Sequence, residues 1–367
     1  DVTYTTRDQV EQHTAHHLCQ RFSLGQRAPL HHGRLYNDFG NLGITEASRH
    51  LFSGSYSFPE GCDRATILYL QEAVRIRKVL EQTPMNQHDV TPQEFIAFWT
   101  SAKERTSSSK SGRHFGHYKA VTDDPTLVTL HVTNINLAAT RGEPLRWWCE
   151  GVNVLLEKIA GNSNIDKLRA ICLLEADFNW WLKIIFARRM MSHMTATNTL
   201  PPEQGATKGK TPLDTALLKR LFFDQSNILH EDSSSSSTDA EYFYDAVNHA
   251  ACSIALQAVG VPINMVKCYL TSVQWMQYFL QTGFGLSAHS YGGSPESICM
   301  GLTQGSGASP GAWSATSTVI VGAYKRQGYG ATLYAGWSRD NVNLAALLYV
   351  DDTDLLHSAP TRRLPLS

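Results

Sequence analysis

Residues 347–354 read LLYVDDTD, an apolar run that ends in adjacent acids. The run reaches Val350, Asp351 and Asp352 follow directly, and apolar residues resume at Leu355. This alternation predicts a β-hairpin that carries two carboxylates at its tip. Such a pair is usually a solvated turn, and it becomes a candidate site only if another acid converges on it from a separate strand.

Asp239 is the candidate for that third acid. It opens residues 239–249, which read DAEYFYDAVNH and lead into a predicted helix ending before Gly260. Three carboxylates at one point repel each other unless cations neutralise them. Oxygen-only ligands select Mg²⁺, with Mn²⁺ as the alternative, over zinc. Two such ions about 4 Å apart stabilise both the attacking and the leaving oxygen of a phosphoryl transfer.

Two further segments would complete a phosphoryl-transfer site. Residues 303–311 read TQGSGASPG, a Gly/Ser-rich loop ahead of a predicted helix, where glycine permits close backbone approach. Residues 147–171 predict two strands around a turn, which places Lys158 and Arg169 on facing strands. Their cationic ends would then project into a shared space.

Other segments carry weaker signals. Apolar periodicity predicts helices over 65–80 and 264–279. Arg188, with its neighbouring arginine, is interpreted as a cation that favours a helix C-terminus. The five serines of 233–237 are low-complexity and predict a flexible loop. Residues 103–119, KERTSSSKSGRHFGHYK, predict a mobile basic loop, and a solvated linker and a phosphate-handling loop remain equal alternatives.

Composition excludes several classes of protein. Hydrophobic residues make up 42% and charged residues 18%, so wholesale disorder is excluded, and a net charge of −1 excludes a polybasic carrier. No apolar run approaches about 18 residues, which argues against a membrane span. The seven cysteines form no Cys-x-x-Cys pair, and no signal peptide is evident. We therefore expect an intracellular protein of the cytoplasm or nucleus, not a secreted one.

In this order the motifs resemble those of the reverse transcriptases, the RNA-directed DNA polymerases of retroelements, and most closely the non-LTR and diatom-type retrotransposon enzymes. The resemblance covers roughly residues 100–357. It implies an α+β right-hand polymerase with fingers and a palm built on an antiparallel sheet. The implied units are a helical N-terminal region over 1–100, fingers over 101–230 and an incomplete palm over 231–367. The segments that carry it are 111–120, 155–171, 239–249, 303–313 and 347–354.

The resemblance assigns catalytic and metal-binding roles one residue at a time. Asp239 matches the first metal-binding acid, and Ala240 would offer a backbone carbonyl. Asp351 matches the second shared ligand, and Asp352 is its weaker partner. Tyr244 matches the steric gate, whose ring fills the space that a ribose 2′-hydroxyl needs, and this favours deoxynucleotides over ribonucleotides.

The resemblance also assigns substrate contacts. Lys158 and Arg169 would hold the incoming triphosphate, Arg169 as the bidentate partner. Gln304 and Gly305 would pack on the nascent base pair, and Ser306 would donate a hydrogen bond to nucleic acid, although helix capping explains that serine almost as well. The resemblance also implies that Lys110 and Arg113, in the basic segment, contact nucleic acid.

Two departures limit what this resemblance implies. A polyserine tract precedes Asp239 where the family has an apolar strand, and Ser367 follows the hairpin closely, so we expect a fragment without a thumb. The expected partners are an RNA template, a DNA primer and deoxynucleoside triphosphates, with the oligomeric state open. The alternative is an inactive retroelement remnant, or a maturase-like domain that binds RNA without polymerase activity.

Overall fold

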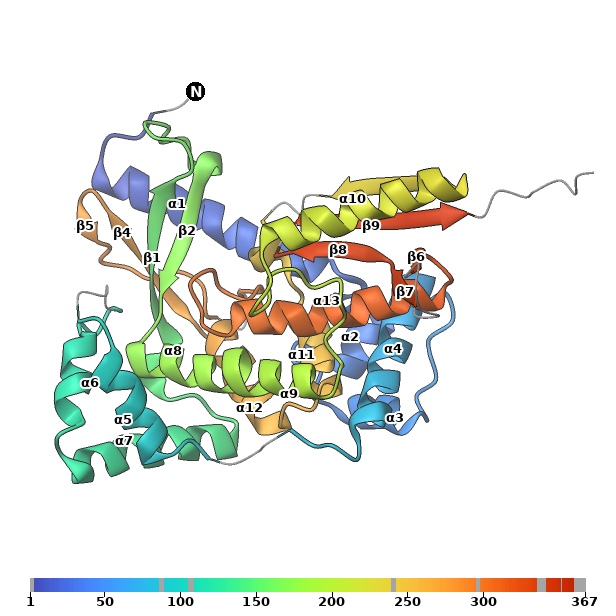
Figure 1. Ribbon diagram of the computed structural model, residues 1–367. Helices are drawn as coiled ribbons and strands as arrows, with labels where there is room; N and C mark the ends of the chain where they lie inside the picture. The colour runs from blue at the N-terminus through green and yellow to red at the C-terminus, as the bar shows by residue number, and fades with distance from the viewer. Residues whose placement is uncertain are drawn as a thin grey trace, which may run out of the picture.

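The chain folds as an α+β protein, which confirms that part of the predicted fold class (Figure 1). The computed structural model describes residues 3–85, 89–104, 109–238, 242–294, 298–334, 341–350 and 352–359. Within these ranges the strands form a mixed four-stranded sheet, an antiparallel three-stranded sheet and a two-stranded hairpin. None of the described helices combines the length and apolar character that a membrane span requires.

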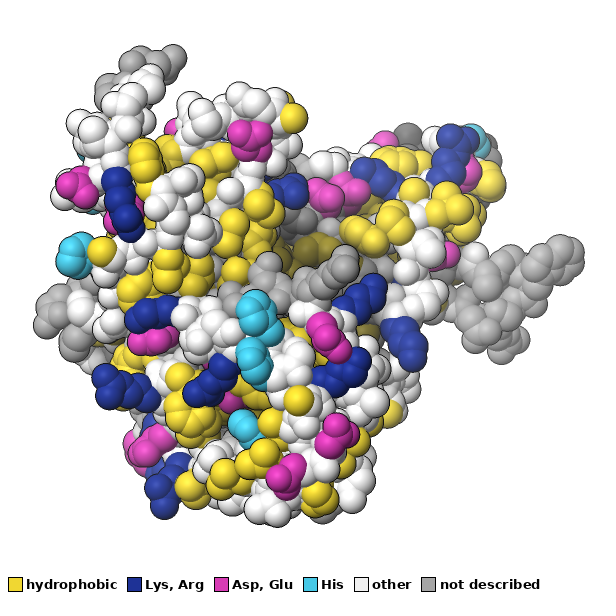
Figure 2. Space-filling view, turned by 90° about the vertical axis from the view of Figure 1, so that its left-hand side faces the viewer, with side chains coloured by type: hydrophobic (Ala, Val, Ile, Leu, Met, Phe, Trp, Pro, Cys, Tyr) yellow, Lys and Arg dark blue, Asp and Glu magenta, His cyan; other side chains and the backbone are white. Residues whose placement is uncertain are grey.

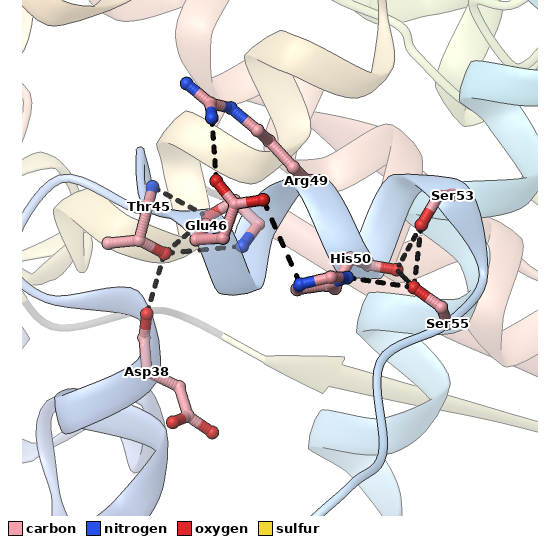
Figure 3. A network of polar contacts seen from close by, with 8 residues as sticks. Asp38, Thr45, Glu46, Arg49, His50, Ser53 and Ser55 are labelled. Carbon is pink, nitrogen blue, oxygen red and sulfur yellow. Dashed lines mark hydrogen bonds and ion pairs between the residues drawn. The ribbon is translucent and has the colours of Figure 1, made fainter.

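The N-terminal region is helical and shares a hydrophobic core with the helices of the second half of the chain. The predicted helix over 65–80 is confirmed as α4. Local capping starts α3, where the hydroxyl of Thr45 accepts from the Ser48 amide at 3.3 Å and donates to the Asp38 carbonyl at 2.6 Å (Figure 3). The elements are α1 Arg7–Phe22, α2 Gly33–Phe39, α3 Glu46–Ser53, α4 Arg64–Leu80, α5 Pro92–Ser101, α6 Phe115–Val121 and α7 Pro125–Arg141.

The predicted hairpin after Trp147 is confirmed as β1 (Glu150–Glu157) and β2 (Leu168–Leu173), which pair antiparallel. A third strand, β4 (Gln277–Thr282), joins β1 in parallel, and the short β5 (Gly285–Leu286) follows it. The prediction of one helix over 264–279 is therefore wrong at its end. The helix α12 (Ile263–Gln274) ends before β4, whose residues from Gln277 to Gln281 pair with β1 instead of continuing the helix.

Buried helices fill the middle of the molecule. The helix α8 (Ala176–Leu182) continues through a π-helix (Lys183–Met190) into α9 (Met191–Ala196). The helix α13 (Ser309–Arg326) runs beside this composite helix (Figure 1) and packs on α4 and on α11 (His249–Ala258).

The antiparallel sheet has the order β3 (Asp232–Thr238), β9 (Asp352–Ala359), β8 (Ala346–Tyr349). The helix α10 (Pro212–Leu229) lies along it (Figure 1). The hairpin β6 (Ala331–Tyr334) and β7 (Asn341–Leu344) lies beside the sheet. The prediction that the polyserine tract is a flexible loop is wrong, because β9 provides a pairing partner for every residue of β3.

Candidate functional site

The predicted hairpin at residues 344–356 is confirmed, with Tyr349 of β8 opposite Asp352 at the start of β9. Thr238, the last residue of β3, lies opposite Thr353. The two predicted catalytic segments are thus attached to the same end of neighbouring strands. Asp352 is exposed at that end, whereas Asp239, Ala240 and Asp351 lie outside the described residues.

Asp354 shows how these strands are tied together. Its carboxylate accepts from Lys219 Nζ at 2.8 Å and from the Ser237 hydroxyl, 117 positions earlier in the chain. Burial opposes ionisation of Asp354, but these two hydrogen bonds outweigh it and hold the pKa below its usual value. Asp354 therefore joins α10, β3 and β9, and a serine of the polyserine tract has a structural partner.

The backbone at the hairpin tip is strained. Val350 has φ of 60°, in the left-handed region that β-branched residues rarely adopt. Such strain persists only where surrounding structure imposes it, and it concentrates at functional sites. The flanking pairing of Tyr349 with Asp352 imposes it here.

A pocket of about 530 Å³ brings three predicted site residues together: Tyr244, Gly305 and Ser306. Tyr244 comes from the 3-10 turn Phe243–Ala246, and its carbonyl accepts from the Leu302 amide at 2.7 Å. That hydrogen bond holds the turn against the segment that leads into the Gly/Ser-rich loop.

Two cations that the sequence did not assign to a site, Lys183 and Arg188, also line this pocket. Burial, followed by the positive charge of Arg188, lowers the pKa of Lys183. A cation that is partly desolvated beside another cation favours an anionic ligand. Arg188 therefore lines a candidate binding site, in contrast to the interpretation of it as a helix-terminal cation.

The Gly/Ser-rich loop is fastened to β2 and α8. The Cys172 amide donates to the Gln304 carbonyl at 2.7 Å, and Gly305, with φ of 112°, leaves no room for a Cβ against the Cys172 carbonyl. Asn179 accepts from the Gly307 amide at 2.6 Å and donates to the Gly305 carbonyl at 3.3 Å. The glycine at 305 is thus required by close approach to the fold itself.

Ser306, also in this loop, is buried. Its hydroxyl accepts from the Ala308 amide at 3.1 Å, just before α13 begins. The N-cap of α13 is Ala308, and no side chain caps the helix, so the capping role that the sequence offered for Ser306 is wrong and its hydroxyl closes a local turn ahead of the helix.

Lys158 and Arg169 are both exposed on the β1–β2 hairpin. The Lys158 amide donates to the Lys167 carbonyl at 3.2 Å, and Arg169 lies opposite Leu156. The positive charge of Lys158 acts on buried Asp245, whose pKa is raised by burial despite nearby Arg21 and Lys158. Lys158 therefore lies near the turn that carries Tyr244 and Asp245.

Asp245 is fixed by Arg21 of α1. The Nε of Arg21 lies 2.5 Å from Asp245 Oδ2, and both side chains are buried. The same guanidinium lies over the Tyr242 ring at 4.4 Å and donates to the Leu168 carbonyl at 3.4 Å. One side chain thus joins α1, the Tyr244 turn and the start of β2.

The described part of the basic segment is not the mobile loop that the sequence predicted. The Ser109 and Ser111 hydroxyls donate to Glu175, and α6 begins at Phe115. Lys110 Nζ lies 3.3 Å from Glu150 Oε1 and 3.8 Å above the Phe279 ring. Buried Glu175 accepts the hydrogen bonds of the two serines and so holds the segment in place. The sequence did not reveal this partner because Glu175 lies more than sixty positions further along the chain.

The described ranges hold no cluster of three or more His, Cys, Asp or Glu side chains arranged for a metal ion. Of the carboxylates expected to bind metal, Asp352 alone falls within these ranges, and the other two are attached next to Thr238 and Asp352. No protein-family model and no curated protein matches this sequence, so the site geometry and the motif order carry the functional argument.

Proposed function

We propose that this chain comprises the fingers and palm of an RNA-directed DNA polymerase of the reverse transcriptase type. The observation that carries the proposal is the β3–β9 pairing, which places Thr238 opposite Thr353. The residues next to them, Asp239 and Asp352, belong to two motifs far apart in the sequence. In this assignment the β3–β9–β8 sheet belongs to the palm and the β1–β2 hairpin to the fingers.

Asp239, Asp351 and Asp352, with the Ala240 carbonyl, would hold Mg²⁺ or Mn²⁺. This all-oxygen donor set fits either ion, and the strand pairing supports its convergence. When bound, the ions neutralise phosphate charge and stabilise the attacking and leaving oxygens. The hairpin tip would hold its acids in place through the strained geometry of Val350.

The remaining residues would bind and select the nucleotide. Lys158 and Arg169 hold the triphosphate, and the Tyr244 ring excludes a ribose 2′-hydroxyl. The primer 3′-oxygen attacks the α-phosphate of a deoxynucleoside triphosphate, and pyrophosphate leaves. Lys183 and Arg188 support this assignment because they add positive charge to the pocket that contains Tyr244.

Primer extension on an RNA template with Mg²⁺ and deoxynucleotides tests the proposal. The unmodified chain should extend the primer, and Asp351→Asn should abolish extension while it leaves template–primer binding largely intact. Asp232→Asn, at the exposed far end of β3, is the matched control and should extend normally.

Extension by Asp351→Asn at the unmodified rate would overturn the assigned metal site. RNA binding that is salt-sensitive and survives Asp351→Asn, with no extension by the unmodified chain, would replace the polymerase proposal with the maturase-like alternative.

A further inference from the structure

A second pocket, of about 430 Å³, lies between α6, α7, α8 and the 3-10 turn Arg146–Cys149. It shares no lining residue with the Tyr244 pocket. Figure 2 views the molecule from this side and shows histidine and Lys/Arg side chains near one another across the middle of the face. The polar side chains that line the pocket include Arg113, Tyr118, His131, Asn134 and Asp177.

Asp177 provides a fixed acceptor. It is 1% exposed, and its carboxylate accepts from Trp147 Nε1 at 3.2 Å, Trp148 Nε1 at 3.1 Å and the Phe178 amide at 2.8 Å. A carboxylate offers about four acceptor positions. Three donors therefore orient the group and leave capacity for one more N–H.

Tyr118 provides an unused donor in the same pocket. It is 2% exposed, and no described residue accepts a hydrogen bond from its hydroxyl, while Arg113 lies close enough to donate to the phenol oxygen. Burial raises the pKa of this phenol, so it keeps its proton at neutral pH. A buried O–H without an acceptor is unfavourable, and an acceptor on a ligand would satisfy it.

The pocket also has an aromatic face and a cation. Trp147 lines the pocket and is half-buried, and the exposed guanidinium of Arg113 lies 5.6 Å from the centre of its ring. His117 lines the pocket on the same helix as Tyr118 and is exposed. A planar ligand can stack on the indole while an anionic group attached to it meets Arg113.

We propose that this pocket binds a nucleotide, with the base between Trp147, Tyr118 and Asp177 and the phosphate at Arg113. A nucleobase has a flat face, a hydrogen-bond acceptor and an N–H donor on one edge, which matches these three side chains. The ligand is either a free nucleotide or an unpaired residue of a single strand. The proposal does not require polymerase activity, because none of these residues belongs to the proposed catalytic site.

Calorimetric titration of the full chain with each of the four nucleoside 5′-monophosphates tests this proposal. The parent nucleosides and inorganic phosphate are titrated alongside. Tyr118→Phe removes only the hydroxyl and keeps the ring that stacks on Trp99 at 4.6 Å, so the fold should persist. We expect it to weaken binding of the best monophosphate about tenfold, the equivalent of one lost hydrogen bond.

Two further variants complete the design. Arg113→Gln should weaken monophosphates and leave nucleosides unchanged. Tyr56→Phe, whose hydroxyl bonds Asp38 in the N-terminal region, is the matched control and should bind normally. Equal weakening of nucleoside and monophosphate by Arg113→Gln would overturn the placement of the phosphate.

The source of the ligand is decided by titrating single-stranded RNA octamers of each base. Tyr118-dependent binding that is tighter for an octamer than for its monophosphate identifies a strand residue, and the reverse identifies a free nucleotide. Absence of any Tyr118-dependent binding would overturn the proposal. The titration is also repeated with Asp351→Asn, which should bind the nucleotide in this pocket as the unmodified chain does. A failure of the nucleotide proposal can therefore be distinguished from a failure of the polymerase proposal.

Discussion

The buried carboxyl of Asp177 should make the stability of the protein depend on pH in a defined direction. Burial raises its pKa from 3.8 to about 6, although Trp147 and Trp148 donate to it. Between about pH 4 and pH 6 the folded state therefore binds this proton more tightly than the unfolded state does. The stabilisation is complete below about pH 4 and is lost as the pH rises through 6. Each pKa unit corresponds to about 1.4 kcal/mol, so the loss is about 3 kcal/mol.

Asp177→Asn isolates this effect because asparagine does not titrate. We would measure the free energy of unfolding by urea denaturation at several values between about pH 4 and pH 7. The difference between the unmodified chain and the variant cancels the other titrating groups. As the pH rises, the free energy of unfolding of the variant should increase by about 3 kcal/mol relative to that of the unmodified chain. A difference that is constant with pH, or that shifts in favour of the unmodified chain, would refute the reasoning.

Two other substitutions test the contacts that position the Tyr244 pocket. Arg21→Met leaves the carboxylate of Asp245 buried without its cation, so the free energy of unfolding in urea should fall by about 3–5 kcal/mol. Adding Asp245→Asn should recover most of that loss. A loss below about 1 kcal/mol would contradict the importance of this ion pair. Gly305→Ala places a methyl group against the Cys172 carbonyl at a φ of 112°, which should cost more than about 1 kcal/mol and detach the loop. The Cys172 amide, which bonds the Gln304 carbonyl, should then exchange its hydrogen faster, and unchanged exchange would show that the loop tolerates the methyl group.

Elements whose partners are close in sequence could be predicted from the sequence. The β1–β2 and β8–β9 hairpins follow from apolar strands around short polar turns, and the structure confirms both. The strand β3 could not be predicted in this way. Serine has little preference for strands, and the tract is ordered by pairing with β9, which begins more than a hundred residues later.

Two cations that line the Tyr244 pocket could not be found by sequence reasoning, for a geometric reason. Lys183 and Arg188 are five positions apart, and in an α-helix of 3.6 residues per turn such side chains point about 140° away from each other. The structure has a π-helix from Lys183 to Met190, whose wider turn brings positions i and i+5 to the same side. Both cations therefore line one pocket with Tyr244 and Gly305. Since π-helical turns are frequent at functional sites, this irregular turn is itself an argument that the pocket is a functional site.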